Sequence, residues 1–432
     1  FYDLIQKLKS KIFGSALVRN TLLLSLATLL AQLIAIIFSP VLSRLFTPNN
    51  FGELGKIVAY SSIFVGVASL KYDLAIVLSK SAFETKQLIK VSHALIVIIS
   101  LISIPIYAVI YQVFDPYILL SIILIIYFNS VYNIIINIHT RYKKFKSIAV
   151  LKVINKGITV GTQIGLGVFG LGTFGLIIGQ VLGLFLTLVY SSIKSLKTFK
   201  KVIFVGRGSY DEAKPVIKKY YRFPVFTAPQ NFLNSLSQNA PILLLDGFFG
   251  ATMIGLYWFA FRIIQMPIVF ISNSIRQTFY QKASVTNPGK ELTSLFVKST
   301  RSLFLIGLPF IIIGMLILPY LFAFIFGAEW TESGVYGRWL LPWVLFLFIN
   351  PPAVMLIPIL NMQKFNLVYD IYLLAARILV VCIGGYFFTP LITIILFSLV
   401  SSVFNIFIIG FVYYKLKFLN VVKIRNKPNA AD

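Results

Sequence analysis

Long runs of apolar residues, separated by short polar breaks, cover almost the whole 432-residue chain. Each run is close to the roughly 20 predominantly apolar residues that an α-helix needs to cross a bilayer. The runs do not alternate apolar and polar residues, as the strands of a membrane barrel do. The pattern therefore predicts an all-α integral membrane protein with about twelve transmembrane helices. The expected spans are residues 20–44, 53–79, 88–110, 117–138, 148–168, 173–193, 220–245, 252–277, 297–318, 337–360, 367–388 and 391–414.

The charge of the chain fits this topology. Only 12% of the residues are charged, against about 25% in soluble proteins, and 58% are hydrophobic. The net charge is +26. With both termini in the cytoplasm, and with cations near a span end counted in the adjoining segment, the cytoplasmic segments carry 31 of the 39 lysines and arginines, and the outer loops carry Arg44, Lys56 and Arg338. Such a bias follows the positive-inside rule, so nucleic acid is not needed to explain the charge.

A repeat of the first half in the second is indicated by a few matching positions. Phe51-Gly52 follows the first expected span and Phe249-Gly250 follows the seventh. Two halves of six helices around a central site are a common transporter plan. The sequence predicts an N-terminal six-helix bundle at residues 1–195, a cytoplasmic linker at 196–219, a C-terminal six-helix bundle at 220–415 and a basic cytoplasmic tail at 416–432. Because one chain supplies both halves, a monomer is expected.

Several cations lie inside the expected spans, where a charge is costly unless it faces water, a partner or a ligand. Lys and Arg near span ends can also snorkel to the interface, and this alternative suits Arg44 and Lys152. Asp73 is explained equally well as the partner of a neighbouring cation or as a group for ion coupling. The residues predicted to line a cationic, substrate-binding cavity are Lys71, Arg262, Arg377, Arg44, Lys156 and Lys152.

Two other patterns stand out within the spans. A polar stripe, formed by Gln230, Asn231, Asn234 and Gln238 in the seventh span and echoed by Gln32 in the first, is too polar to face lipid. We expect it to line a wet cavity, with hydrogen bonding between helices as the alternative. Glycines at intervals of four residues permit close helix packing, and they are Gly157, Gly161 and Gly165 in the fifth span and Gly175, Gly179 and Gly183 in the sixth.

Enzymatic chemistry finds no support in the sequence. The two histidines, His93 and His139, have no metal-ligand spacing, and the single Cys382 excludes disulfides and cysteine-based metal sites. No glycine-rich phosphate loop with its lysine is present. We therefore expect no enzyme, no catalytic residue, no metal and no cofactor.

Two stretches of the sequence carry a family resemblance. They are Ser39–Gly55 (SPVLSRLFTPNNFGELG) and Ser69–Leu78 (SLKYDLAIVL). Both resemble the signatures of the bacterial polysaccharide exporters, closest to the O-antigen and capsule repeat-unit flippases, in the multidrug/oligosaccharidyl-lipid/polysaccharide (MOP) exporter superfamily. Lys71 stands where many relatives have arginine, which keeps the charge but loses the fork geometry. The first span contains no Asp or Glu, which argues against the drug-exporting branch.

The resemblance implies a flippase that moves undecaprenyl-diphosphate-linked oligosaccharide repeat units from the inner to the outer leaflet of the bacterial inner membrane. Lys71, Arg262 and Arg377 would contact the diphosphate, Arg44 would lie near the outer gate, and the polar stripe would bind sugars. A Na⁺ or H⁺ gradient would drive transport, with Asp73 as the coupling group. Membrane lipids and a polysaccharide polymerase of the same pathway would be partners. The alternatives are a peptidoglycan-precursor flippase, a cation-coupled drug exporter of the same superfamily and, more remotely, a membrane polysaccharide polymerase.

Overall fold

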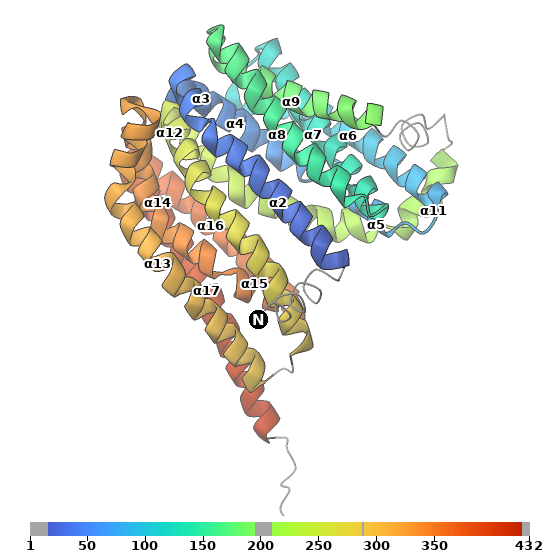
Figure 1. Cartoon of the computed structure of the whole chain (residues 1–432). Coiled ribbons are helices and arrows are strands. Elements are labelled where there is room, and N and C mark those ends of the chain that lie inside the picture. Colours follow the sequence, from blue (N-terminus) through green and yellow to red (C-terminus); the bar gives the residue numbers. More distant parts are fainter. Residues whose placement is uncertain (1–15, 195–209, 287–288, 426–432) are drawn as a thin grey trace, which may run out of the picture. The chain divides into compact units, whose positions relative to one another are not determined.

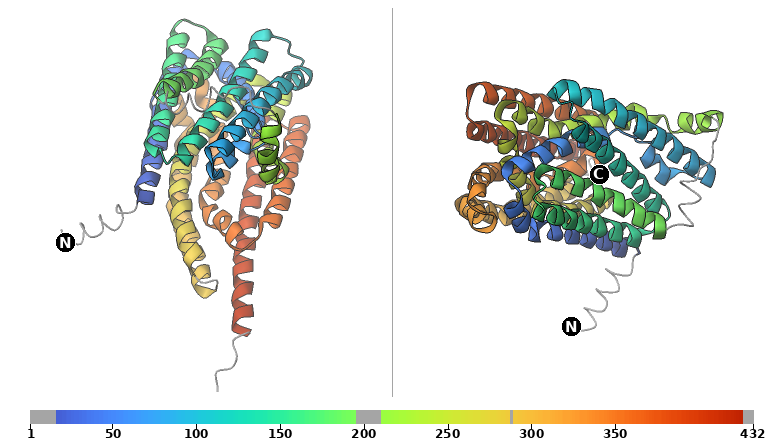
Figure 2. Two further views of the ribbon diagram at one scale, coloured as in Figure 1. Left: turned by 90° about the vertical axis from the view of Figure 1, so that its right-hand side faces the viewer. Right: turned by 90° about the horizontal axis from the view of Figure 1, so that it is seen from above.

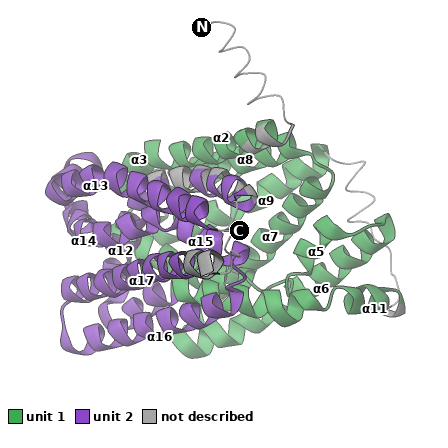
Figure 3. Cartoon of the chain, turned by 90° about the horizontal axis from the view of Figure 1, so that it is seen from below, with its two compact units in different colours: residues 1–239 green, residues 240–432 purple. Residues whose placement is uncertain are grey.

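The chain is helical throughout the part that the structure describes, as predicted (Figure 1). A computed structural model describes residues 16–194, 210–286 and 289–425, and no strand occurs among them. Figure 2 shows the same helices from two further directions. The chain divides into two compact units, Phe1–Asn239 and Ala240–Asp432, coloured separately in Figure 3. The six-helix bundles and the linker expected at residues 196–219 stay a prediction.

Unit 1 begins with short and long helices in alternation and ends inside a long helix. Its elements are α2 (Ala16–Ile37), α3 (Ser39–Leu45), α4 (Pro48–Val65), α5 (Tyr72–Leu78), α6 (Ala82–Tyr111), α7 (Pro116–Arg141), α8 (Phe145–Val168), α9 (Gly172–Lys194), α11 (Tyr210–Lys219), the π-helix η1 (Phe223–Thr227) and the first part of α12 (Ala228–Val285).

Unit 2 consists of the rest of α12 and the helices that follow it. They are α13 (Lys290–Phe326), the 3₁₀ turn η2 (Ala328–Trp330), α14 (Thr331–Ile349), α15 (Pro351–Ile359), α16 (Gln363–Phe387) and α17 (Pro390–Arg425). Gly250, at φ +78°, interrupts the helical backbone of α12, and glycine adopts this conformation without the steric strain of a side chain.

Nine helical segments of the described residues are long and apolar enough to cross a membrane. The other three expected spans differ from these in identifiable ways. The second is divided between α4 and α5. The fifth is the 24-residue helix α8, whose hydropathy is lowered by Lys152 and Lys156. The eighth continues from the seventh as one element, α12, across Gly250.

The glycines of α9 are packing positions, as the sequence predicted. A Cβ added at Gly183 would lie 2.8 Å from Thr159 Cβ, and one at Gly179 would lie 3.0 Å from the backbone nitrogen of Gln163, both on α8. The same prediction is wrong for α8 itself. Its glycines Gly157, Gly161 and Gly165 are exposed, and nothing lies within 4 Å of an added Cβ. Spacing alone did not distinguish the two rows, because only one of them meets a neighbouring helix.

We expect Gly183→Ala and Gly161→Ala to have opposite effects on stability. At Gly183 the new methyl group overlaps Thr159, and such overpacking costs about 1–3 kcal/mol. At Gly161 the methyl group meets open space, and removing a mid-helix glycine stabilises by roughly 0.5–1 kcal/mol. Thermal unfolding of the purified protein in detergent measures both effects. Equal unfolding temperatures for the two variants would contradict the packing of α9 on α8.

Candidate functional site

The second expected span is interrupted where the candidate cation lies. Helix α4 ends at Val65, and α5 begins at Tyr72. Between them Leu70 and Lys71 both adopt left-handed backbone conformations, with φ of +46° and +63°. An uninterrupted helix through Lys71 was expected, and this expectation is wrong. Lys71 is half-buried at the break, and its ammonium group has no hydrogen-bond partner among the described residues. Breaks of this kind are typical of binding sites in transporters.

Asp73, two residues beyond Lys71, is buried at 6% exposure. Its carboxylate accepts a hydrogen bond from the Ser69 hydroxyl and a second, of 2.9 Å, from the Asn137 amide. Neither donor is charged, and no ion pair joins Asp73 to a lysine or arginine of the described residues. Neutral hydrogen bonds therefore hold this carboxylate. The sequence analysis missed both donors; Asn137 lies 64 residues away, so only the fold brings it to this point.

The polar stripe of the seventh span begins α12 and reaches the same break. A Cβ added at Gly66, directly after α4, would lie 2.6 Å from the hydroxyl oxygen of Ser235. Glycine at this position thus allows the start of α12 to approach α4 closely. On α12, Gln230, Asn234 and Gln238 are exposed along one face.

Two contacts show how the stripe is held. Asn231 donates a 2.9 Å hydrogen bond to the backbone oxygen of Thr227, and Gln238 donates one of 3.1 Å to Asn234. The stripe residues therefore hydrogen-bond along their own helix, and Gln230 keeps an exposed side chain. This arrangement leaves polar groups available on the face that the sequence predicted to be wet.

The cations of α8 lie against α2. Lys152 donates a 3.2 Å hydrogen bond to the Thr28 hydroxyl. Gln32 lies one turn further along α2 and is half-buried, as is Lys156 one turn along α8. Both helices thus present polar side chains at matching heights. Arg44 is exposed in the short helix α3, and nothing among these contacts joins it to the others.

In unit 2, Arg377 of α16 is enclosed by aromatic rings. It is 6% exposed, and its guanidinium carbon lies 5.3 Å from the ring centre of Trp343 and 5.5 Å from that of Phe397. Its Nε donates a 3.2 Å hydrogen bond to Ser401, and the carboxylate of Asp370 interacts with it electrostatically. These contacts satisfy much of the guanidinium group within unit 2 itself.

Arg262 of α12 has a different setting. It is half-buried, and its guanidinium carbon lies 5.3 Å from the ring centre of Trp258, one turn earlier on the same helix. No ion pair with a described carboxylate holds it. Arg262 is therefore the more accessible of the two arginines. Because the two units are described separately, one cavity that combines Lys71 with Arg262 and Arg377 stays a prediction.

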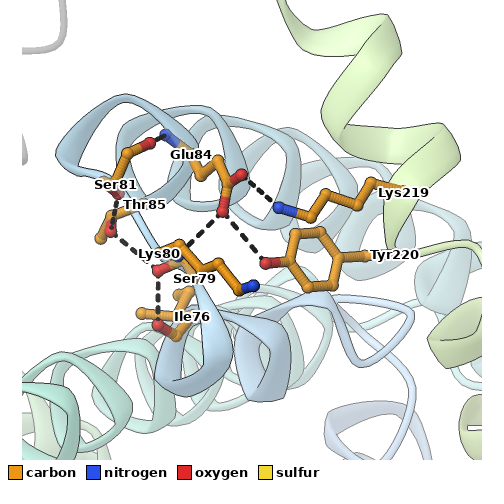
Figure 4. A network of polar contacts seen from close by, with 8 residues as sticks. All are labelled: Ile76, Ser79, Lys80, Ser81, Glu84, Thr85, Lys219 and Tyr220. Atoms are coloured by element: carbon orange, nitrogen blue, oxygen red, sulfur yellow. Dashed lines mark hydrogen bonds and ion pairs between the residues drawn. The ribbon is translucent and has the colours of Figure 1, made fainter.

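A polar cluster, which the sequence analysis did not predict, holds the linker helix α11 to the start of α6 (Figure 4). Glu84 forms an ion pair with Lys219 and accepts a 3.1 Å hydrogen bond from the Tyr220 hydroxyl. One turn further along α6, Gln87 donates a 3.0 Å hydrogen bond to Glu212. The hydrogen bond to Glu84 raises the pKa of Lys219 above its ordinary value. A raised lysine pKa means that the contact is complete at neutral pH and is lost as the pH rises through the raised value.

Reversing the charge of Lys219 should release α11 from α6. In Lys219→Glu, two carboxylates face each other, so we expect chymotrypsin to cut after Tyr220 and Tyr221 several-fold faster than in the parent protein. Combining Lys219→Glu with Glu84→Lys restores opposite charges and should restore protection. Lys218→Glu is the matched control, because Lys218 is exposed and forms no ion pair with a described residue. Unchanged cleavage in Lys219→Glu would show that apolar contacts alone hold α11.

Comparison with known proteins shows to which family the chain belongs. The sequence pattern of a family described as polysaccharide biosynthesis protein matches residues 41–334. The chain belongs to this polysaccharide biosynthesis family. The resemblance to the polysaccharide exporters that Ser39–Gly55 and Ser69–Leu78 indicated is thereby confirmed. No curated protein matches the chain.

Solved structures of transporters share the fold of this family member. An inward-facing multidrug resistance MATE transporter of the MOP superfamily is 14% identical and covers 90% of this chain and 96% of its own, with a TM-score of 0.63. A MOP superfamily transporter from Pyrococcus furiosus, whose binding pocket is described as reversed in polarity, is 13% identical, with coverages of 93% and 96% and a TM-score of 0.58. A MATE protein in a bent conformation is 13% identical, with coverages of 94% and 96% and a TM-score of 0.57.

These likenesses establish the fold class. The all-α integral membrane fold predicted from the sequence is that of the MATE and MOP transporters. The solved structures with this fold are described as transporters, which agrees with the prediction that this family member is not an enzyme. The predicted site residues are placed by the structure, and their roles stay predictions.

Proposed function

We propose that this polysaccharide biosynthesis family member is a flippase that carries undecaprenyl-diphosphate-linked oligosaccharides from the inner to the outer leaflet by alternating access. The diphosphate is the part of such a substrate that costs the most free energy to move through the bilayer. Moving an isolated charge into an apolar medium costs on the order of tens of kcal/mol by continuum estimates. A transporter lowers this barrier when it supplies fixed cations along the route.

The observation that carries the proposal is the excess of cations over carboxylates in the membrane-spanning segments. Lys71, Lys152 and Arg262 all lie in these segments, and none forms an ion pair with a described Asp or Glu. Cations in a membrane are usually paired or face a cavity. Three cations without carboxylate partners therefore favour an anionic ligand over a purely structural role.

We assign the diphosphate to Lys71, Arg262 and Arg377, and Arg44 to the outer gate. Lys152 and Lys156 would extend the cationic path along α8. The sugars would contact the exposed amides of the polar stripe, since amide and hydroxyl groups exchange hydrogen bonds readily.

The test is complementation of a bacterial strain that lacks its own repeat-unit flippase. The wild-type chain should restore surface polysaccharide, and Arg262→Gln should not, at equal abundance in the membrane. Lys298→Gln is the matched control, because Lys298 is an exposed cation of α13 in the same unit. If Arg262→Gln restores surface polysaccharide, Arg262 is not part of the proposed substrate route. Failure of the folded wild type in several hosts would overturn the lipid-linked oligosaccharide as substrate.

We further propose that an ion gradient drives transport through Asp73, and that Asp73→Asn abolishes it. Asparagine keeps the shape of the side chain and one acceptor oxygen for Ser69 or Asn137, but it neither ionises nor exchanges a proton. The measurement is transport by the reconstituted protein with and without a Na⁺ or H⁺ gradient. Gradient-dependent transport by Asp73→Asn at the parent rate would exclude Asp73 as the coupling group.

The cellular setting follows from the same proposal. The substrate places the protein in the bacterial inner membrane, with both termini in the cytoplasm according to the charge bias. A monomer is sufficient, and the polymerase that consumes the flipped repeat units would be a partner in the pathway.

A further inference from the structure

A small cavity with a basic lining lies between the ends of α7, α8 and α9, wholly within unit 1. Its volume is about 220 Å³. Pockets for drug-sized ligands typically measure roughly 300–1,000 Å³, so an oligosaccharide does not fit. The polar side chains that line it are His139, Lys146, Ser147, Tyr190, Ser191 and Lys194. No carboxylate is among the described residues that line it.

The two lysines of this cavity keep their charge uncompensated. Neither Lys146 nor Lys194 forms an ion pair with a described residue. Lys194 donates a 2.9 Å hydrogen bond to the Tyr190 hydroxyl, and its nitrogen lies 5.4 Å from the centre of that ring. These contacts orient the ammonium group without neutralising it.

Ser191 is a buried hydroxyl without a partner. The residue is 3% exposed, and its oxygen forms no hydrogen bond with any residue that the structure describes. Buried polar groups are nearly always hydrogen-bonded, and the exceptions call for an explanation. Because Ser191 lines the cavity, a ligand there would supply the missing hydrogen bond.

His139 has a ring nitrogen available for a ligand. Its Nδ1 lies 2.9 Å from the backbone oxygen of Ile135. A carbonyl oxygen only accepts, so Nδ1 carries the proton and Nε2 is left for other contacts. His139 is buried, and its Nε2 can accept a hydrogen bond from the hydroxyl of a partly protonated phosphate.

The first turn of α8 forms one wall of this cavity, through Lys146 and Ser147. The N-terminus of a helix favours anions, because its backbone N–H groups lack partners and the helix dipole is positive there. A neighbouring cavity of about 530 Å³ shares Lys146 and adds Arg19, Lys143 and Lys144. The field on this side of the unit is therefore strongly positive.

We propose that the α7–α8–α9 cavity binds a phosphate group, either as the headgroup of an anionic phospholipid or as free phosphate or diphosphate. Lys146 and Lys194 supply charge, Ser191 donates its orphaned hydroxyl, and the first turn of α8 contributes its dipole. The site stands independently of the proposed transport activity, and none of these residues belongs to the cationic path assigned above.

The experiment measures binding to the full chain purified in neutral detergent. The probes are short-chain phosphatidylglycerol, short-chain phosphatidylcholine, inorganic phosphate and pyrophosphate, each titrated against the unfolding temperature. Phosphatidylglycerol should stabilise the protein at lower concentration than phosphatidylcholine if the source is a lipid. Stabilisation by phosphate or pyrophosphate at least as strong would assign a free anion instead.

The variants decide whether the cavity is the site. Lys146→Gln and Lys194→Gln should each weaken binding about tenfold, and Ser191→Ala about threefold to tenfold. Lys364→Gln is the matched control, since Lys364 is an exposed lysine in the first turn of another helix, α16. Equal stabilisation by phosphatidylglycerol and phosphatidylcholine, with none by phosphate or pyrophosphate, would overturn the proposal, as would no stabilisation by any probe. An equal loss in Lys364→Gln, or no loss in Ser191→Ala, would show diffuse surface charge and would overturn it as well.

Discussion

Arg377→Ala should strongly destabilise unit 2, by about 2–5 kcal/mol, the cost typical of truncating a large buried side chain to alanine. The side chain packs beside the contacting rings of Trp343 and Phe397, and its Nε donates a hydrogen bond to Ser401. Alanine leaves a void beside the two rings and removes the cation that interacts with Asp370. The measurement is the unfolding temperature of the detergent-purified protein, followed by its elution as a monodisperse peak.

Two further variants make this result interpretable. Arg377→Met keeps an unbranched chain beside the rings and removes the charge and the hydrogen bond to Ser401, so we expect a smaller loss of about 1.5 kcal/mol. Arg301→Ala is the control, because Arg301 is an exposed arginine of α13 in the same unit. Unfolding of Arg377→Ala at the parent temperature would contradict the structural role of the enclosed guanidinium group.

The Met variant also separates structure from transport. Arg377 is buried beside two aromatic rings, which restricts how a ligand can reach it, whereas Arg262 contacts one ring and is half-buried. If folded Arg377→Met still carries substrate, the charge of Arg377 stabilises unit 2 and is not needed for transport. If it folds and does not carry substrate, Arg377 contributes to the cationic path.

The helices and their membrane character could be predicted from the sequence because apolar length is a local property. Runs of about 20 apolar residues specify spanning helices wherever they occur. The break after α4 could not be predicted in this way. Val67, Ala68 and Leu70 are ordinary membrane-helix residues, and Gly66 is the one local signal of an interruption. The residue that packs on Gly66 at the break is Ser235, which lies 169 positions further along the chain.

The site residues show the same division between local and distant causes. The charge of each site residue follows from its residue type, and its approximate depth follows from its position in a span. These two properties were enough to select Lys71, Asp73 and Arg377. Their surroundings do not follow, because Asn137 reaches Asp73 and Ser401 reaches Arg377 only through the fold. Predicting whether a cation is enclosed or available therefore requires the packing of helices that are distant in sequence.

Lys71→Asn should reduce transport roughly 10- to 100-fold, which corresponds to the loss of one charge-assisted hydrogen bond of about 1.5–3 kcal/mol. Lys71 holds a left-handed backbone at φ +63°. Asparagine is among the residues that adopt this conformation most readily, so the substitution removes the charge and preserves the break. The measurement is surface polysaccharide in the complemented strain, normalised to the amount of protein in the membrane.

Lys143→Asn is the matched control for that result. Lys143 is also a lysine in a left-handed conformation, at φ +54°, but it lies exposed in the turn between α7 and α8. The control should transport at the parent rate, and Lys71→Arg should retain most of the activity because it keeps the charge. Equal activity of Lys71→Asn and Lys143→Asn would mean that transport requires the backbone geometry of the break but not the charge of Lys71. Loss of activity in Lys71→Asn and also in Lys71→Arg would point to a fit specific to the ammonium group. Loss in Lys71→Asn alone would identify positive charge at the helix break as what the anionic substrate requires.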